Sequence, residues 1–156
     1  MIIGFTLNGR PREIDVPPSQ TLLRTLRDTL GVFDAKEGCS EGVCGACTVL
    51  LDGRPVSSCL VLTPTARGRR VLTVRGLERA GDLHPLQTAF VEHGAVQCGF
   101  CTPGMVLTAL AFLEQRPRPD REEIRAALAG NLCRCTGYAK ILDAVEAYVS
   151  GRRADG

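Results

Sequence analysis

Eight cysteines in a chain of 156 residues constrain this protein more than any other sequence feature. They fall into two sets of four, one in each half of the chain. The N-terminus shows no charged segment followed by an apolar stretch and a cleavage site, so no export signal is indicated. Without export, so many thiols are more typical of metal binding than of a disulfide framework. We therefore expect two domains, residues 1–77 and 78–156, each with one four-cysteine site.

The first set has the spacing of a plant-type [2Fe–2S] ferredoxin. Its members are Cys39, Cys44, Cys47 and Cys59. Three of them come from one loop, which must bend sharply around a compact cluster and aim its amide hydrogens at sulfur. Gly38, Gly42 and Gly45 supply the backbone freedom for such a loop. A structural zinc site is the alternative, but zinc usually takes two separated C-x2-C pairs, so the spacing favours iron–sulfur.

The second set combines a C-x2-C pair with a C-x-C pair. Its members are Cys98, Cys101, Cys133 and Cys135. Each pair lies just before an expected helix start, at Thr102 and at Thr136, and the positive end of a helix dipole suits an anionic cluster. Zinc and a redox disulfide are the alternatives for this set. The C-x-C pair is tighter than a common zinc knuckle, which favours a second [2Fe–2S] cluster.

Hydrophobic periodicity predicts a mixture of strands and helix for the first half of the chain. Alternating apolar residues on both sides of a turn at residues 8–9 predict a β-hairpin, and residues 22–30 carry leucines at helical spacing. Further strands are expected at 48–51 and 70–74. These elements together predict a small sheet curled around one helix.

The second half is predicted to hold four short helices that form a bundle. The expected helix starts, each with a capping residue, are His84, Thr102, Asp120 and Thr136. Asp120 also forms a capping box with Glu123. We expect a linker near residues 76–82 and a frayed tail over residues 151–156.

Composition and motifs exclude several classes of function. The formal net charge is only +2, with no basic stripe, which argues against nucleic-acid binding. No apolar run approaches the roughly 18 residues of a membrane span. There is no P-loop and no G-x-G-x-x-G motif, so the chain has no nucleotide site of its own. His84 and His93 are assigned to helix ends, and no catalytic arrangement of Ser, His and Asp is visible.

Three segments around the cysteines carry a family resemblance. They are Glu37–Cys47, Gln97–Gly104 and Asn131–Tyr138. Over residues 2–150 the chain resembles the iron–sulfur small subunit of the molybdenum hydroxylases, the xanthine oxidase family, which includes carbon monoxide dehydrogenase-like and aldehyde oxidoreductase-like members. The resemblance implies an α+β protein in which a β-grasp, plant-type ferredoxin-like [2Fe–2S] domain precedes a four-helix-bundle [2Fe–2S] domain.

The same resemblance implies a role and partners. The chain would be the electron-transfer component of an oxidoreductase, with no catalytic residue of its own, because substrate chemistry takes place in a large molybdopterin-binding subunit. Electrons released there would pass to the helical-domain cluster, then to the ferredoxin-like cluster, and on to FAD in a medium subunit. Some relatives run this path in reverse. A cytoplasmic dimer of such heterotrimers is expected.

Gln97 is the one residue other than cysteine to which the resemblance gives a site role. The glutamine at this place contacts the pterin cofactor of the partner subunit, and its amide can both donate and accept hydrogen bonds. The alternative for Gln97 is a solvent-facing residue at a helix end. For the whole chain, the alternatives are a free-standing two-cluster electron shuttle and a zinc-stapled interaction module.

Overall fold

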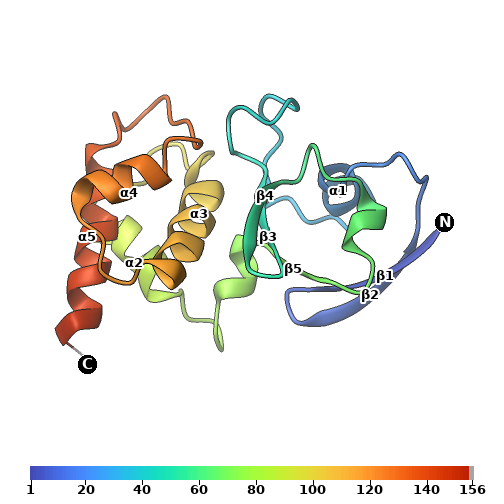
Figure 1. The fold of residues 1–156 in the computed structure, drawn as a ribbon, viewed down its shortest axis with the longest axis horizontal. Helices are drawn as coiled ribbons and strands as arrows, with labels where there is room; N and C mark the ends of the chain where they lie inside the picture. Colours follow the sequence, from blue (N-terminus) through green and yellow to red (C-terminus); the bar gives the residue numbers. More distant parts are fainter. Residues whose placement is uncertain (155–156) are drawn as a thin grey trace.

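The computed structural model describes residues 1–154, and its first half is a five-stranded mixed sheet (Figure 1). The strands are β1 (Ile2–Leu7), β2 (Arg10–Asp15), β3 (Thr48–Leu51), β4 (Arg54–Ser57) and β5 (Arg70–Leu72), in the order β2-β1-β5-β3-β4. β1 runs parallel to β5, and the other neighbours are antiparallel. The predicted hairpin is confirmed: Asn8 and Gly9 both have positive φ, as a two-residue turn between twisted strands requires.

One short helix packs against this sheet. α1 (Leu22–Arg24) continues as a π-helical turn, η1 (Thr25–Thr29), in which the amide of Leu30 bonds the carbonyl of Thr25 at 3.0 Å. The predicted regular helix over residues 22–30 is therefore only partly correct. Leu22, Leu23 and Leu26 are nevertheless buried against the strands, and Leu30 is partly buried. The shared core contains Ile3, Phe5, Leu7, Leu22, Leu23, Leu26, Val49, Leu51 and Val71. The expected sheet around a single helix is confirmed.

Two 3-10 turns complete this half of the chain, η2 (Thr63–Ala66) and η3 (Val74–Leu77). β5 ends at Leu72 rather than at residue 74, because the chain turns there and the amide of Gly76 bonds the carbonyl of Thr73.

Four α-helices make up the described part of the second half. They are α2 (Pro85–Glu92), α3 (Thr102–Gln115), α4 (Arg121–Ala127) and α5 (Ala139–Ala154). Two predicted caps are confirmed. His84 and Gln87 form a capping box at α2, and Asp120 and Glu123 form one at α4. The core between the helices is largely aliphatic, with Phe90, Met105, Leu113, Ile141 and Val145 fully or almost fully buried.

Two predicted helix starts are wrong. Thr102 is not a cap but the first residue of α3, because Cys101 before it already has near-helical backbone angles. α5 begins at Ala139 rather than after Thr136, because Tyr138 has a φ of +72° and interrupts the helical path. At the other end, α5 continues through Ala154. The prediction of a frayed tail is therefore wrong for residues 151–154. Residues 155–156 lie outside the described part of the chain.

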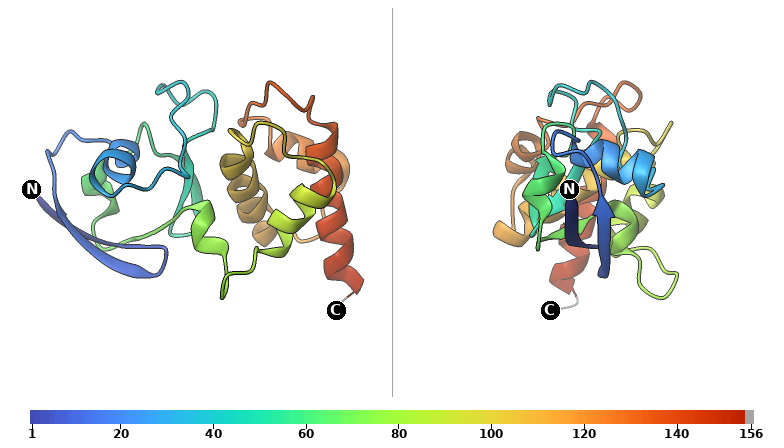
Figure 2. Two further views of the ribbon diagram at one scale, coloured as in Figure 1. Left: turned by 180° about the vertical axis from the view of Figure 1, so that it is seen from behind. Right: turned by 90° about the vertical axis from the view of Figure 1, so that its right-hand side faces the viewer.

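The two halves pack directly on each other. α3 lies against β3, and the inner-facing Leu50 of β3 belongs to the core of the helical half together with Leu77. The predicted linker over residues 76–82 is a short ordered turn in which Arg79 and Asp82 exchange backbone hydrogen bonds. Two opposite views show the loops that carry the cysteines on the same side of the molecule (Figures 1 and 2). None of the described helices is long and apolar enough to span a membrane.

Candidate iron–sulfur sites

The first cysteine loop follows η1 and returns to the sheet at β3. Gly42 and Gly45 have φ values of +80° and +73°, which L side chains rarely adopt, so the predicted need for glycine is confirmed at these two positions. Gly38 serves a different purpose. Its φ is not positive, but a Cβ there would lie 2.8 Å from the sulfur of Cys44. Glycine at residue 38 therefore provides space for a sulfur rather than a special backbone angle.

Backbone amides in this loop point at sulfur, as the sequence predicts. The amides of Glu41, Val43 and Cys44 lie 3.5, 3.3 and 3.4 Å from Sγ of Cys39. The amide of Ala46 lies 3.5 Å from Sγ of Cys44. These donors, that of Glu41 foremost, lower the pKa of Cys39 to about 6. The loop therefore favours negative charge on this sulfur.

The other two cysteines of the set close the site from the sheet. Cys47 immediately precedes β3, Cys59 follows β4, and both are buried. Burial raises the pKa of Cys59 to about 11, and the neighbouring thiols of Cys47 and Cys39 act in the same direction. The thiol of Cys44 is likewise a neighbour of Cys39 and contributes, after the backbone donors, to the lowered pKa of Cys39. The structure thus brings together all four cysteines that the sequence grouped.

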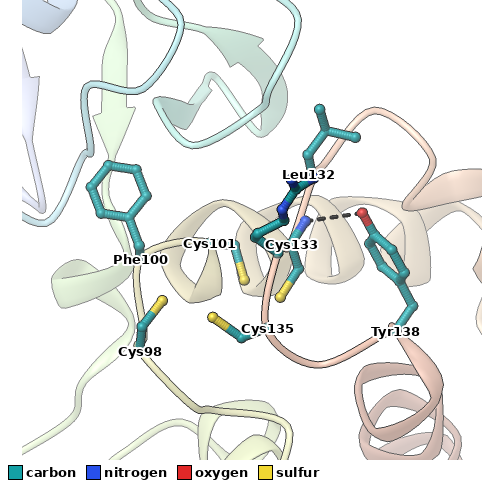
Figure 3. A pocket seen from close by; sticks show the side chains of 8 residues that line it. Cys98, Phe100, Cys101, Leu132, Cys133, Cys135 and Tyr138 are labelled. Atoms are coloured by element: carbon teal, nitrogen blue, oxygen red, sulfur yellow. Dashed lines mark hydrogen bonds between the residues drawn. The ribbon is translucent and has the colours of Figure 1, made fainter.

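The second set gathers around a cavity of about 600 Å³ (Figure 3). The residues that line it are Cys98, Phe100, Cys101, Leu132, Cys133, Arg134, Cys135 and Tyr138. The four sulfur atoms point into a common space from the start of α3 and from the loop before α5. Burial raises the pKa of Cys101 to about 12, whereas Cys98 and Cys135 are exposed. The site therefore has a closed side and an open side.

Thr136 donates two hydrogen bonds to the sulfur of Cys133, one from its hydroxyl at 3.1 Å and one from its amide at 3.4 Å. Burial acts to raise the pKa of Cys133, but these donors outweigh it and lower the pKa to about 7. The amide of Cys133 in turn donates to the hydroxyl of Tyr138 at 3.0 Å. Of the two helix starts expected at this site, only that of α3 directly follows a cysteine, because α5 begins beyond Tyr138.

A short bridge of hydrogen bonds joins the two sites. The amide of Leu132 donates to the carbonyl of Cys44 at 2.9 Å, and the buried side chain of Asn131 donates to the carbonyl of Gly45 at 3.2 Å. Leu132 adjoins Cys133 in sequence, so one backbone hydrogen bond connects residues of the two sites. Asn131 opens the third segment of the family resemblance, but the sequence assigns it no site role of its own. Its position two residues before Cys133 is the signal that it contributes to the site.

Gln97 lies in the loop between α2 and α3, directly before Cys98, and its side chain is exposed. It is therefore on the surface beside the more open side of the second cysteine set. This position leaves its amide accessible from outside the chain.

The donor chemistry of both sites suits a [2Fe–2S] cluster. Each site presents four thiols, amide or hydroxyl hydrogens directed at sulfur, and small residues where the chain passes closest. Within residues 1–154, no three His, Cys, Asp or Glu side chains are grouped as the ligands of a single metal ion would be.

Comparisons with known proteins agree with this assignment. Residues 5–73 match the model of a 2Fe-2S iron-sulfur cluster binding domain, and residues 73–146 match that of a [2Fe-2S] binding domain. The chain is 51% identical over 143 residues to the nicotinate dehydrogenase small FeS subunit of Eubacterium barkeri, which covers 92% of this chain and 91% of the relative.

Solved structures share the whole fold. Quinoline 2-oxidoreductase from Pseudomonas putida 86 superposes with a TM-score of 0.94 at 46% identity, covering all of this chain and 97% of that one. Aldehyde oxidoreductase from Desulfovibrio desulfuricans superposes with a TM-score of 0.93 at 40% identity, covering 99% of this chain but only 17% of that one. The same fold therefore occurs both as a separate chain and as a part of a much longer one.

Fold, cysteine sites and comparisons define a protein with two [2Fe–2S] domains, ferredoxin-like and helical. Within that class, the chain belongs to the iron–sulfur small subunits of the molybdenum hydroxylase family. Such a chain is the electron-transfer component of an oxidoreductase.

Proposed function

We propose that this chain relays electrons between a molybdopterin site and FAD, each in a partner subunit. Cys39, Cys44, Cys47 and Cys59 hold one [2Fe–2S] cluster, and Cys98, Cys101, Cys133 and Cys135 hold the other. Each bound cluster supplies a centre that takes up and releases one electron. We divide the chain after Leu77, where η3 ends, into residues 1–77 and 78–156.

One observation carries this proposal: the hydrogen bond from the amide of Leu132 to the carbonyl of Cys44. A relay needs its two centres close together and fixed in relative position. The bond connects the two cysteine sites through the backbone, and Asn131 reinforces it from a buried position. The residues of this chain thus hold the two sites in one fixed arrangement.

Exposed apolar side chains beside the cysteines support permanent partners. Val43, Leu60, Phe100 and Leu132 each adjoin a cysteine in sequence and are 46–61% exposed. Exposed apolar residues gathered at a functional site are typical of a surface that another protein covers. We therefore place the chain with a large molybdopterin-binding subunit and a medium FAD-binding subunit, as a dimer of heterotrimers in the cytoplasm. A free-standing shuttle is the second candidate.

Metal analysis and paired cysteine variants test the cluster assignment. The purified native complex should contain about four irons and four acid-labile sulfides per copy of this chain. Cys101→Ala should abolish one of its two paramagnetic signals, and the matched Cys47→Ala should abolish the other. A colourless preparation that carries zinc and no labile sulfide would contradict the proposal. Elution of the chain as a monomer from its own cell extract would favour the shuttle.

We also propose that Gln97 contacts the pterin cofactor of the large subunit. Its exposed position directly before Cys98 leaves its amide free to reach a partner. Gln97→Ala should slow reduction of the clusters by substrate while both paramagnetic signals keep their full intensity. Gln115→Ala, at the opposite end of α3, is the control, because Gln115 is equally exposed but remote from the cysteines. Unchanged turnover in Gln97→Ala would remove this role.

A further inference from the structure

We propose that the hydroxyl of Thr136 raises the reduction potential of the helical-domain cluster by donating a hydrogen bond to the sulfur of Cys133. This inference rests on the proposed function, because it requires Cys133 to be a cluster ligand. A donor to sulfur stabilises the more negative, reduced state of an iron–sulfur cluster. Thr136 is therefore a positioning and tuning residue for electron transfer, not a catalytic one.

The direction of the hydrogen bond follows from the surroundings of the hydroxyl. Oγ1 of Thr136 accepts a hydrogen bond from the amide of Tyr138 at 3.1 Å, and it lies 3.1 Å from Sγ of Cys133. A threonine hydroxyl has one hydrogen and two lone pairs. One lone pair is directed at the Tyr138 amide, and the sulfur of a cluster ligand carries no hydrogen, so the hydroxyl is the donor in its contact with Cys133.

The loop that carries Thr136 is held in place at both ends. Tyr138 has a φ of +72°, an unfavourable angle for a tyrosine, and the surrounding hydrogen bonds maintain it. Its amide holds the hydroxyl of Thr136, while its own phenol oxygen accepts from the amide of Cys133 (Figure 3). Thr136 is also β-branched, so its χ1 is restricted. The donor is thus in position before the sulfur gains charge.

Thr136 differs in kind from the donors at the other site. The sulfurs of the ferredoxin-like site receive their hydrogen bonds from the backbone amides of Glu41, Val43, Cys44 and Ala46. Among the residues the structure describes, Thr136 is the only one whose hydroxyl donates to a cysteine sulfur. The potential of the helical-domain cluster can therefore be changed through one side chain, and that of the other cluster cannot be changed in this way.

The test is an EPR-monitored redox titration of the intact complex with Thr136→Val, which is nearly isosteric but has no hydroxyl. At the wild-type midpoint, the ratio of reduced to oxidised helical-domain cluster should fall about three- to tenfold, the effect of one hydrogen bond of ordinary strength. That is a downward shift of about 30–60 mV for a one-electron couple. Thr136→Ser, which keeps the hydroxyl, should retain most of the wild-type potential.

The signal of the ferredoxin-like cluster is the internal control and should keep its midpoint in both variants. Cys101→Ala identifies which signal belongs to the helical domain. If valine disturbs the loop and that signal is lost, Thr136→Ala removes the hydroxyl with a smaller side chain and gives the same reading. Unchanged midpoints in a Thr136→Val or Thr136→Ala complex that keeps both signals would overturn the inference. Absence of iron–sulfur signals from the wild-type complex would instead contradict the proposed function.

Discussion

The two cysteine sites are built on different principles. In the ferredoxin-like site, one continuous loop supplies three sulfurs, and residues with positive φ, among them Ser40, Gly42 and Gly45, direct the backbone amides inward. In the helical site, two pairs of cysteines come from segments far apart in sequence, and Cys98 and Cys135 are exposed. The first site is thus specified mainly by local chain geometry and the second by the packing of helices.

The two sites meet at the carbonyl of Gly45. Gly45, in the locally specified loop, offers its carbonyl to the side chain of Asn131, whose position depends on the helical domain. A Cβ on Gly104, at the start of α3, would lie 2.3 Å from the same carbonyl oxygen. The first cysteine loop and the helical domain therefore contact each other closely at the carbonyl of Gly45.

Gly45→Ala should have the largest effect, because it disturbs both sites at once. The φ of +73° costs an alanine about 1–2 kcal/mol. Its Cβ would also lie 2.6 Å from both the Asn131 amide nitrogen and the Gly130 carbonyl oxygen, and overpacking of this kind typically costs about 1–3 kcal/mol more. We expect a total loss of about 2–5 kcal/mol in the free energy of unfolding, measured by urea denaturation, with weaker signals from both clusters.

Gly53→Ala is the matched control for Gly45→Ala. Gly53 has a similar φ of +82°, but a Cβ at this residue would have no other atom within 4 Å. Only the backbone cost of about 1–2 kcal/mol should remain, and both clusters should be retained. Equal losses in the two variants would show that the contact between the sites contributes nothing.

Gly104→Ala should isolate the contact between the sites from backbone strain. Gly104 is helical, so alanine would by itself favour the helix by up to about 1 kcal/mol. The 2.3 Å approach to the Gly45 carbonyl opposes this gain, and we expect a net loss of about 1–2 kcal/mol. Gly151→Ala, in α5 with open space around it, should instead stabilise the protein slightly. Relative to the wild type, the urea midpoint should fall in Gly104→Ala and rise in Gly151→Ala. Stabilisation by both substitutions would contradict this expectation.

Asn131→Ala should weaken the bridge between the sites without adding atoms. The substitution leaves the buried carbonyl of Gly45 with the hydrogen bonds from Thr48 alone. We expect a loss of about 1–2 kcal/mol in the free energy of unfolding. Gln20→Ala removes two side-chain hydrogen bonds, to Thr25 and Thr29, that involve neither cysteine site, and it controls for the general cost. A slower transfer between the clusters only in Asn131→Ala would mark the bridge as the element that fixes their spacing.

Those parts of the molecule that depend on local chemistry are predictable from the sequence. The spacing of Cys39, Cys44 and Cys47 predicts the first loop, and Asp120 with Glu123 predicts the start of α4. The sequence also predicts that Thr136 caps a helix, but its hydroxyl instead bonds Cys133. The sulfur lies only three residues earlier, but the positive φ of Tyr138 delays the helix and leaves the threonine in the loop, and hydrophobic periodicity carries no information about that angle.

Contacts between the two halves are likewise beyond the sequence pattern. The strand pattern over residues 48–51 includes Leu50 as an apolar strand residue. It does not predict that Leu50 joins the core of the helical domain. The π-helical turn after α1 is a second feature that the sequence pattern does not predict. Leucine spacing predicts a helix there, while the wider turn from Thr25 to Leu30 depends on how the chain packs under the sheet.

The smallest expected effect is a pH dependence that comes from His84, in the helical domain. His84 caps α2 by accepting a hydrogen bond from the amide of Leu86 at 3.1 Å, which requires a neutral ring nitrogen. Burial, followed by the nearby charges of Arg79 and Arg152, lowers the pKa of His84 below its usual 6.5. The folded state therefore binds its proton less readily than the unfolded state does.

The sign of the effect follows from this difference in pKa. Above pH 6.5 the ring is neutral in both states and stability is unaffected. As the pH falls from 6.5 through the lower pKa of the folded state, the unfolded chain takes up the proton first, so the helical domain loses stability. His84→Asn keeps a good capping residue but cannot titrate, so it should lose less stability than the wild type between pH 7.5 and 5. Thermal unfolding, followed by the circular dichroism of the helices, measures this loss of stability. Any effect of acid on the clusters is common to the wild type and His84→Asn, so it cancels in the comparison. Parallel pH profiles would show that the cap does not titrate, and would leave the two domains alike in their response to acid.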